Sequence, residues 1–202
     1  MRRLEMEKNV FREIYKKHSR FLKNRKVRGN KKLIICFSGI PGSGKTVLAK
    51  ILEKRYRGVR INSHRIGKIM QELVSKGVIN ENIADGKLQI DYQIWLLKAH
   101  LFTNNLIILD SGVDRKYREV FEVAKQNGYG VFVVRLHVSE KILRKRILIR
   151  NKENARNYFK SFDRWKREFR EFGKKVSSNI ILEDKGEIDL RLLFKELDKL
   201  LR

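Results

Sequence analysis

The chain has 202 residues, of which 42% are hydrophobic and 35% are charged, and this suits one globular domain with a sizeable core. Its longest apolar run, residues 33–37, is far shorter than the roughly 20 residues that a membrane span needs, and its one cysteine, Cys36, cannot form an internal disulfide. Residues 1–30 carry frequent charges and lack the apolar stretch of a signal peptide. These features exclude a membrane protein and predict a cytoplasmic location.

Positive charge dominates the sequence, because 48 Lys and Arg against 23 Asp and Glu give a formal net charge of +25. The excess is concentrated in two blocks, residues 1–32 and 141–175, each with a net charge of +10. Such blocks predict surfaces that face polyanions, with nucleic acid as the first candidate and an acidic small substrate as the second. Heat adaptation, which enriches charged residues, is a third explanation.

Short apolar runs alternate with segments of helical periodicity along the chain, and they predict strands and helices respectively. The expected strands are 33–38, 59–62, 106–110, 131–136 and 179–182. The expected helices are one within 1–32, then 45–56, 65–76, 86–102, 115–127, 139–150, 155–174 and 187–201. Strands separated by helices predict an α/β, doubly wound fold with a parallel sheet covered on both faces.

Both basic blocks contain apolar residues at helical spacing. In residues 1–32 we predict a helix whose apolar stripe packs on the domain and whose basic face either tracks phosphates or faces solvent. In residues 155–174 the aromatic side chains recur three and four residues apart, which favours one buried stripe over a set of base-stacking platforms. The two stripes are Phe11, Ile14, Tyr15, His18, Phe21 and Leu22, and Phe162, Trp165, Phe169 and Phe172.

Residues 39–46 read Gly-Ile-Pro-Gly-Ser-Gly-Lys-Thr and match the phosphate-binding pattern G-x-x-x-x-G-K-[ST]. Glycines let the loop wrap its N–H groups around phosphate, the lysine reaches the β- and γ-phosphates, and the threonine hydroxyl ligates Mg²⁺. The motif follows a buried strand and opens a helix, as this chemistry requires. The residues expected to bind ATP are Gly39, Pro41, Gly42, Ser43, Gly44, Lys45 and Thr46.

Three further residues suit phosphoryl transfer. Asp110 ends an expected strand, where an acidic group would hold Mg²⁺ opposite Thr46. Arg146 and Arg150 stand four residues apart on one helix face and could stabilise charge on the transferred phosphate. The segment 151–154, Asn-Lys-Glu-Asn, lacks the final aspartate of the guanine-specificity motif, so we exclude a GTPase.

Together these residues resemble the P-loop kinases of the polynucleotide-kinase and nucleoside-monophosphate-kinase group. The resemblance covers about residues 33–200 and rests on the segments FSGIPGSGKT, RINSHRIGK, LIILDSGVDRKYREVFEVAKQNGYGVFVV, KILRKRILIR and SSNIILEDKGEIDLRLLFKEL. It implies that the glycine loop binds ATP, that the region after the second strand receives the acceptor, and that a lid carries Arg146 and Arg150. It also implies a domain at 33–202 with a lid at about 141–175, preceded by a basic helical extension at 1–32.

The sequence departs from the polynucleotide-kinase pattern after the second strand. Those kinases place Asp-x-x-Arg there, whereas this chain has His64 at the aspartate position and Gly67 at the arginine position. Monophosphate kinases need no strong base, and Ser63 with Lys68 can be aligned with the Thr and Arg of their corresponding region. Alternatively, His64 or Asp110 could take the proton from the acceptor.

The sequence therefore predicts a Mg²⁺–ATP-dependent phosphotransferase with a nucleic acid, preferably RNA, as acceptor. A nucleoside-monophosphate or other small-molecule kinase is the alternative within the enzymes, with an anionic small substrate. An ATP-binding or ATPase module that associates with RNA without transferring phosphate is the alternative from another class. The sequence leaves the acceptor and the oligomeric state open.

Overall fold

The computed structural model describes residues 2–22, 31–81, 86–150, 152, 155–184 and 188–202. Its strands are β1 (Leu33–Ser38), β2 (Val59–Asn62), β3 (Leu106–Gly112), β4 (Gly130–Val138) and β5 (Ile180–Asp184). Its helices are α1 (Arg2–His18), α2 (Lys45–Tyr56), α3 (Ser63–Ser75), α4 (Gly86–Leu101), α5 (Tyr117–Gln126), α6 (Glu140–Arg150), α7 (Ala155–Lys160), α8 (Phe162–Lys175) and α9 (Arg191–Leu201), with a 3-10 turn, η1, at Ser19–Phe21. Among the described helices, none combines the length and apolar character needed to cross a bilayer.

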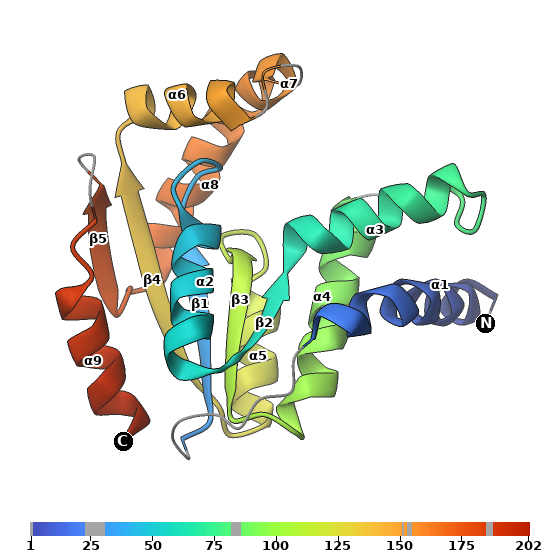
Figure 1. The fold of residues 1–202 in the computed structure, drawn as a ribbon, viewed down its shortest axis with the longest axis horizontal. Helices are drawn as coiled ribbons and strands as arrows, with labels where there is room; N and C mark the ends of the chain where they lie inside the picture. Colours follow the sequence, from blue (N-terminus) through green and yellow to red (C-terminus); the bar gives the residue numbers. More distant parts are fainter. Residues whose placement is uncertain (1, 23–30, 82–85, 151, 153–154, 185–187) are drawn as a thin grey trace.

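The five strands form one parallel sheet in the order β2-β3-β1-β4-β5, with helices on both faces (Figure 1). Strand β1 lies at its centre and is buried along its whole length, which explains why its sequence is apolar without alternation. This is the α/β arrangement with a parallel sheet that the sequence predicts. All strand carboxyl ends lie at one edge of the sheet, and the phosphate loop follows β1 at that edge.

Alternate residues of β1 pack into two separate hydrophobic cores, one on each face of the sheet. Leu33, Ile35 and Phe37 pack with apolar side chains of α2 and α9 on one face of the sheet. Ile34 and Cys36 pack on the other face with α3, α4, α5 and α8. A third, smaller cluster joins α6, α7 and the start of α8. Helices α6 and α7 form the upper part of Figure 1, and α8 runs down from them behind α2. Helices α6, α7 and α8 therefore share an apolar cluster outside the two main cores.

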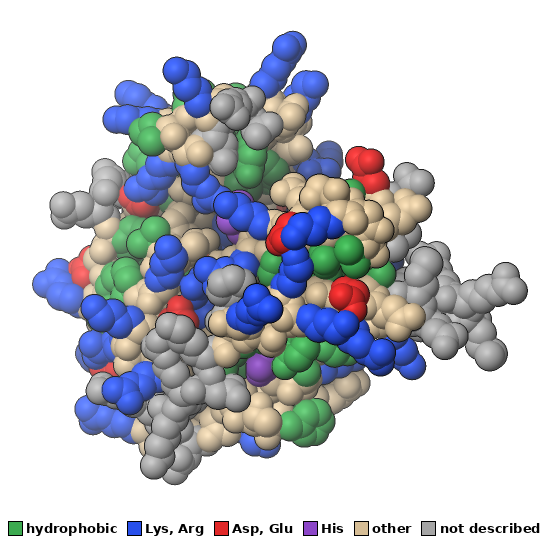
Figure 2. Space-filling model, turned by 45° about the vertical axis from the view of Figure 1, so that its right-hand side comes forward, with side chains coloured by type: hydrophobic (Ala, Val, Ile, Leu, Met, Phe, Trp, Pro, Cys, Tyr) green, Lys and Arg blue, Asp and Glu red, His purple; other side chains and the backbone are tan. Residues whose placement is uncertain are grey.

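The N-terminal helix α1 is a packing element. Ile14 is fully buried, and Val10 joins it in the core shared with α3 and α4. Two aromatic contacts reinforce this packing, because Phe11 lies 5.4 Å from Tyr92 and Tyr15 lies 5.6 Å from Trp95, measured between ring centroids. The opposite face keeps its exposed cations. Figure 2 shows Lys and Arg side chains on many parts of the face that it displays, with few carboxylates between them.

Most of the predicted elements are present, with shifts at their ends. Strand β3 continues past Asp110 to Gly112. The single helix expected at 155–174 is wrong, because the chain breaks at Ser161 into α7 and α8. Ala155 and Phe162, which lie on either side of the break, both pack in one cluster with α6. The start of the last predicted helix, at residue 187, and the pair Asn151 and Asn154 lie outside the described residues.

Candidate active site

The phosphate loop, residues 39–46, connects β1 to α2. Gly42 and Gly44 have φ angles of +91° and +93°, in the left-handed region that side chains disfavour. A Cβ at Gly42 would also approach the carbonyl oxygen of Leu143 to 3.3 Å. Gly44 caps α2 and has no side chain to bond to the first N–H groups of that helix. These N–H groups and the helix dipole therefore favour an anion at this point.

The ammonium group of Lys45 lies within this loop. Its Nζ donates hydrogen bonds to the carbonyl oxygens of Gly39 at 2.5 Å and Ile40 at 3.0 Å. Burial lowers the pKa of Lys45 to about 8, and the carboxylates of Asp114 and Asp110 limit that decrease. Lys45 is therefore charged at neutral pH and can exchange backbone carbonyls for phosphate oxygens.

The carboxylate of Asp110 is buried and is held by side chains from two neighbouring elements. Thr46 Oγ1 donates to Oδ1 at 2.8 Å, whereas Arg60 donates to Oδ2 at 2.7 Å. The Asn62 amide also donates to Oδ2, and Asn62 is the register partner of Asp110 between β2 and β3. The structure thus brings together the two residues that the sequence predicts to hold a metal ion.

An irregularity in the sheet accounts for this placement. Cys36 of β1 pairs with Leu109 of β3, but the next residue of β1 pairs with Gly112. Asp110 and Ser111 therefore form a bulge in β3 and do not pair with β1. A bulge turns side chains away from the directions that a regular strand gives them. Asp110 meets the start of α2, while Ser111 faces a cavity described below.

Thr46 and Asp110 fit a Mg²⁺ ion. Mg²⁺ prefers oxygen ligands and is commonly held by one or two protein oxygens together with substrate phosphates and water. Arg60 and Asn62 already occupy Oδ2 of Asp110, so Oδ1 and the Thr46 hydroxyl are the protein oxygens that would hold the ion, directly or through water. When bound, Mg²⁺ would neutralise charge on the phosphates of ATP.

A pocket of about 750 Å³ extends from the phosphate loop toward α6 and residues 188–190. Arg146 and Arg150, on successive turns of α6, both line it. Arg146 donates to the buried carboxylate of Asp184 at 2.6 Å, whereas the Arg150 side chain is exposed. The two arginines thus share the pocket, but the structure anchors only Arg146 through an ion pair with β5.

His64, in the first turn of α3, lines this same large pocket. Partial burial lowers the pKa of His64, and the neighbouring cations Arg150 and Lys68 lower it further. The side chain is therefore neutral at neutral pH. His64 does not line a smaller cavity, described next, that shares Lys45 with this pocket. Its role as a base therefore remains a prediction.

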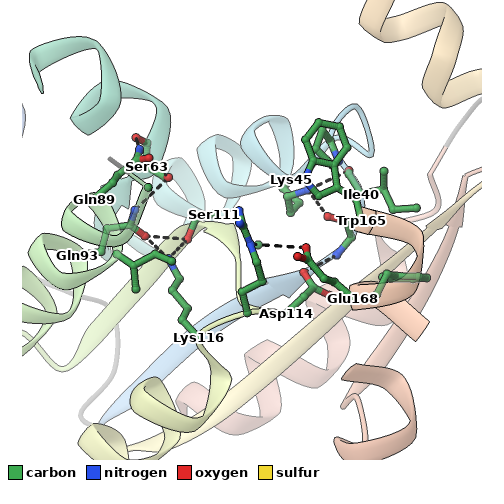
Figure 3. Close-up of a pocket in the computed structure, with 17 residues that line it drawn as sticks. Ile40, Lys45, Ser63, Gln89, Gln93, Ser111, Asp114, Lys116, Trp165 and Glu168 are labelled. Carbon is green, nitrogen blue, oxygen red and sulfur yellow. Dashed lines mark hydrogen bonds and ion pairs between the residues drawn. The ribbon is translucent and has the colours of Figure 1, made fainter. Parts of the chain in front are cut away.

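The second cavity has a volume of about 170 Å³ and lies between α4, the β3–α5 connection and α8 (Figure 3). The two spaces adjoin at the phosphate loop, because six residues line both this cavity and the nucleotide-sized pocket: Pro41, Lys45, Ser63, Gln89, Ser111 and Gly112. One side of the cavity is lined by polar, mostly neutral groups. The opposite side carries Lys45, Asp114, Trp165 and Glu168 (Figure 3).

A network of hydrogen bonds orders the polar side of the cavity. Gln93 Nε2 donates to Ser63 Oγ at 3.0 Å, and Ser111 Oγ donates to Gln93 Oε1 at 3.3 Å. Gln89 Nε2 donates to the Ser63 carbonyl oxygen at 2.6 Å. Sequence reasoning assigned no role to Gln89 or Gln93, because they lie in the middle of a mostly apolar helix, α4, with no motif around them.

Asp114 is the carboxylate that sequence reasoning missed in this cavity. Ser38 Oγ donates to its Oδ1 at 2.6 Å, and the Gly39 N–H donates to Oδ2 at 3.4 Å. A Cβ placed on Gly112 would lie 3.0 Å from Asp114 Oδ2 and 4.0 Å from Lys45 Cε. The space over Gly112 is thus bounded by a carboxylate and by the phosphate-binding lysine. The only signal in the sequence is a second acid four residues after Asp110.

The sequence profile of a family described as AAA domain matches residues 35–173, which is more than half of the chain. The chain belongs to the AAA domain family. The matched region contains the phosphate loop, Asp110, Asp114, Arg146 and Arg150. No curated protein sequence matches this AAA domain protein.

Solved structures with a similar fold include three that cover most of this AAA domain chain. A chain of the PezAT chromosomal toxin-antitoxin system of Streptococcus pneumoniae is 17% identical with a TM-score of 0.61, covering 86% of this chain and 75% of that one. A protein of Chloroflexus aurantiacus J-10-fl, provisionally described as a kinase, is 16% identical with a TM-score of 0.58, covering 85% and 99%. Shikimate kinase from Bacteroides thetaiotaomicron is 16% identical with a TM-score of 0.51, covering 84% and 98%. This protein therefore has the fold of P-loop kinases.

The two α6 arginines, Arg146 and Arg150, are expected to behave differently when each is changed to alanine. Arg146→Ala leaves the buried Asp184 carboxylate without this ion pair, so we expect a lower unfolding midpoint as well as slower phosphate release from ATP. Arg150→Ala should keep the midpoint and lower turnover by up to about 10²-fold, with a smaller change in ATP affinity. Thermal unfolding and steady-state ADP release measure both effects. Equal losses of stability in the two variants would contradict the assigned difference.

Proposed function

We propose that this AAA domain protein is a phosphotransferase that moves the γ-phosphate of Mg²⁺–ATP to a hydroxyl group of a small polar compound. The observation that carries the proposal is the polar cavity of about 170 Å³ that adjoins the phosphate loop at Lys45 and contains Asp114. A single water molecule needs about 10–15 Å³ of cavity volume, so this cavity has room for on the order of a dozen waters or one small molecule. Shikimate kinase, a kinase by name, shares the fold.

In the proposed reaction the acceptor hydroxyl lies over Gly112, between Asp114 and Lys45. Its oxygen forms a bond to the γ-phosphorus, and the bond from that phosphorus to the β,γ-bridging oxygen breaks, releasing ADP. The hydroxyl proton passes to the Asp114 carboxylate. Lys45 and the N-terminus of α2 stabilise the phosphate charge, and Arg146 and Arg150 close on it from α6.

Asp114 suits the proton-accepting role better than Asp110. Three side chains, Thr46, Arg60 and Asn62, already donate to the Asp110 carboxylate, which faces the start of α2 and does not line the acceptor cavity. Asp114 has hydrogen bonds only to Ser38 and Gly39 among the described residues, and it lines the acceptor cavity. The residues therefore divide into a metal-side carboxylate and an acceptor-side carboxylate.

An RNA acceptor is supported less well than a small molecule. A cavity of about 170 Å³ does not have the dimensions of a duplex or a structured RNA. The N-terminal basic block also has a structural role, since α1 buries Val10 and Ile14 in the core. We infer that α6, α7 and α8 act as the lid over the nucleotide, and that residues 33–202 carry the phosphotransfer site.

Transfer of labelled phosphate from ATP to a panel of acceptors tests the proposal. The panel contains polyols, sugars, hydroxy acids, nucleosides, nucleoside monophosphates and an RNA oligonucleotide with a free 5′-hydroxyl. We expect label on one class of small hydroxyl compound and little on RNA. Strong labelling of RNA that weakens steeply between about 50 and 200 mM salt would instead support the nucleic-acid acceptor.

A variant that narrows the cavity tests whether the acceptor binds there. Gly86, at the start of α4, lines the cavity, and a Cβ built there meets no described atom within 4 Å. Gly86→Leu should therefore fold and raise the KM for the small acceptor by about tenfold or more, because it occupies part of the space. Ala99→Leu, at an exposed position of the same helix, is the matched control. An unchanged KM in Gly86→Leu would place the acceptor elsewhere.

A further inference from the structure

Lys116 is a buried cation in the wall of the acceptor cavity. It is the residue that precedes α5, it is only 3% exposed, and it lines the cavity on the side of Gln93 and Ser111 (Figure 3). Lysine is rarely buried this far unless it is paired. Neither the nucleotide-sized pocket nor the proposed phosphate transfer makes use of it.

The hydrogen-bond partners of Lys116 are neutral. Its Nζ donates to Ser111 Oγ at 2.6 Å and to the side-chain oxygen of Gln93. Among the described residues no carboxylate forms an ion pair with Lys116, although Asp114 and Glu119 are near enough to favour its charged form. Burial lowers the pKa of Lys116 to about 8, so the group still carries its proton at neutral pH.

A buried ammonium group with neutral partners is costly, because desolvation is not offset by an opposite charge. An ammonium has three N–H donors, and the two described partners accept two of them. The neighbouring Cys36 thiol does not supply the missing charge, since burial raises its pKa to about 12. The opposite charge would therefore have to come from a ligand in the cavity.

A second cation borders the same space. Arg115 lines the cavity and lies 3.6 Å from Glu168, measured between Nε and Oε2. Glu168 also lies 3.8 Å from Arg164, so two arginines share one carboxylate. Over the described lining of the cavity, three cations, Lys45, Arg115 and Lys116, outnumber two carboxylates, Asp114 and Glu168, and this favours an anion within it.

Resting on the proposed function, we propose that Lys116 determines acceptor specificity by binding an oxyanion, a carboxylate or a phosphate, that the hydroxyl-bearing acceptor carries. Bound this way, the acceptor spans the cavity from Lys116 to the space over Gly112. Its anionic end neutralises the buried ammonium, while its hydroxyl lies between Asp114 and Lys45. Neutral polyols of the same size would leave the ammonium unpaired and bind more weakly.

Three probes of the same carbon skeleton test this inference: glycerol, glycerate and glycerol 3-phosphate. Their dissociation constants are measured by calorimetry in the presence of a non-hydrolysable ATP analogue and Mg²⁺. We expect the wild-type protein to bind at least one anionic probe about tenfold or more tightly than glycerol. Comparison of glycerate with glycerol 3-phosphate then distinguishes a carboxylate from a phosphate ligand.

Variants of Lys116 test whether this side chain causes the preference for the anionic probes. Lys116→Met removes the charge and should abolish the preference for the anions, whereas Lys116→Arg should retain part of it. Lys125→Met, an exposed lysine of α5, is the matched control and should keep the wild-type preference. If Lys116→Met does not fold by circular dichroism, Lys116→Gln, which can still bond to Gln93 and Ser111, takes its place.

The inference is overturned if the wild-type protein binds glycerol as tightly as the anions, if it binds none of the probes, or if the preference survives the loss of the Lys116 charge. Labelled-phosphate transfer, measured in parallel, separates this outcome from failure of the proposed function. Transfer without anion preference leaves the function standing and overturns the role of Lys116. Lys116-dependent anion binding with no transfer to any acceptor supports the site and overturns the function.

Discussion

Lys45→Ala is expected to abolish phosphate transfer, with a loss of about 10³-fold or more, in a protein that remains folded. The lysine contributes a charge at the β- and γ-phosphates, and no other described lysine lines the nucleotide-sized pocket. Its contacts in the free protein are to carbonyl oxygens of the loop itself, so the sheet and the two cores do not depend on it. ADP release with and without acceptor gives the measurement.

The pH dependence of ATP binding is a second readout of the same residue. Because burial lowers the pKa of Lys45 to about 8, the free protein carries this charge below pH 8 and loses it above, although an ordinary lysine stays charged to about pH 10. ATP should therefore bind wild-type protein progressively more weakly as the pH rises through 8. Lys45→Ala should lack this decline, since it has no charge to lose.

Lys50→Ala is the matched control for Lys45→Ala, because Lys50 is an exposed lysine one turn further along α2. It should bind ATP and turn over at wild-type rates. Turnover near the wild-type rate in Lys45→Ala would exclude the proposed use of the phosphate loop.

Asp114→Asn is expected to lower the rate of transfer to the acceptor by about 10²- to 10⁴-fold, the range typical of losing a general base. Asparagine has nearly the same shape and can still accept the hydrogen bond from Ser38, so the phosphate loop should keep its conformation. ATP affinity should therefore change little, and the loss should appear in kcat with acceptor. Single-turnover transfer of labelled phosphate measures it.

Two further variants distinguish a role of Asp114 in proton transfer from a role in holding the phosphate loop. Ser38→Ala removes the 2.6 Å hydrogen bond and leaves the Asp114 carboxylate in place, so it should retain most of the activity if the carboxylate acts on the acceptor. Asp163→Asn changes an aspartate whose side chain is 91% exposed and controls for the loss of one negative charge. A Ser38→Ala defect as large as that of Asp114→Asn would show that Asp114 acts only by positioning the loop.

Features that depend on neighbours in the sequence could be predicted from it. The phosphate loop needs glycine at positions with left-handed backbone, a lysine and a threonine in one continuous run, and residues 39–46 contain all of them. Strand β1 is apolar along its length because both faces are covered, and this also shows in the sequence. The α/β fold with a parallel sheet followed from the alternation of strands and helices, and its kinase type from the phosphate-loop motif and the resemblance built on it.

The acceptor cavity could not be predicted in this way, because its residues come from segments far apart in the chain. Gln93 of α4, Lys116 before α5 and Glu168 of α8 meet only after the strands between them have paired. Each residue looks ordinary locally: a glutamine in an apolar helix, a lysine after a strand, a glutamate in a basic helix. Their joint chemistry depends on distances that no periodicity encodes.

The same reasoning explains the metal-side carboxylate, the lid and the basic extension. The sequence by itself determined that Asp110 ends an apolar run, that Arg146 and Arg150 share a helix face, and that residues 1–32 contain an amphipathic helix. Only the tertiary structure decided that a bulge turns Asp110 toward Thr46, that Asp184 anchors Arg146, and that α1 is buried against α3 and α4. Pattern and propensity act over a few residues, whereas burial and charge pairing act between surfaces that the fold has first to bring together.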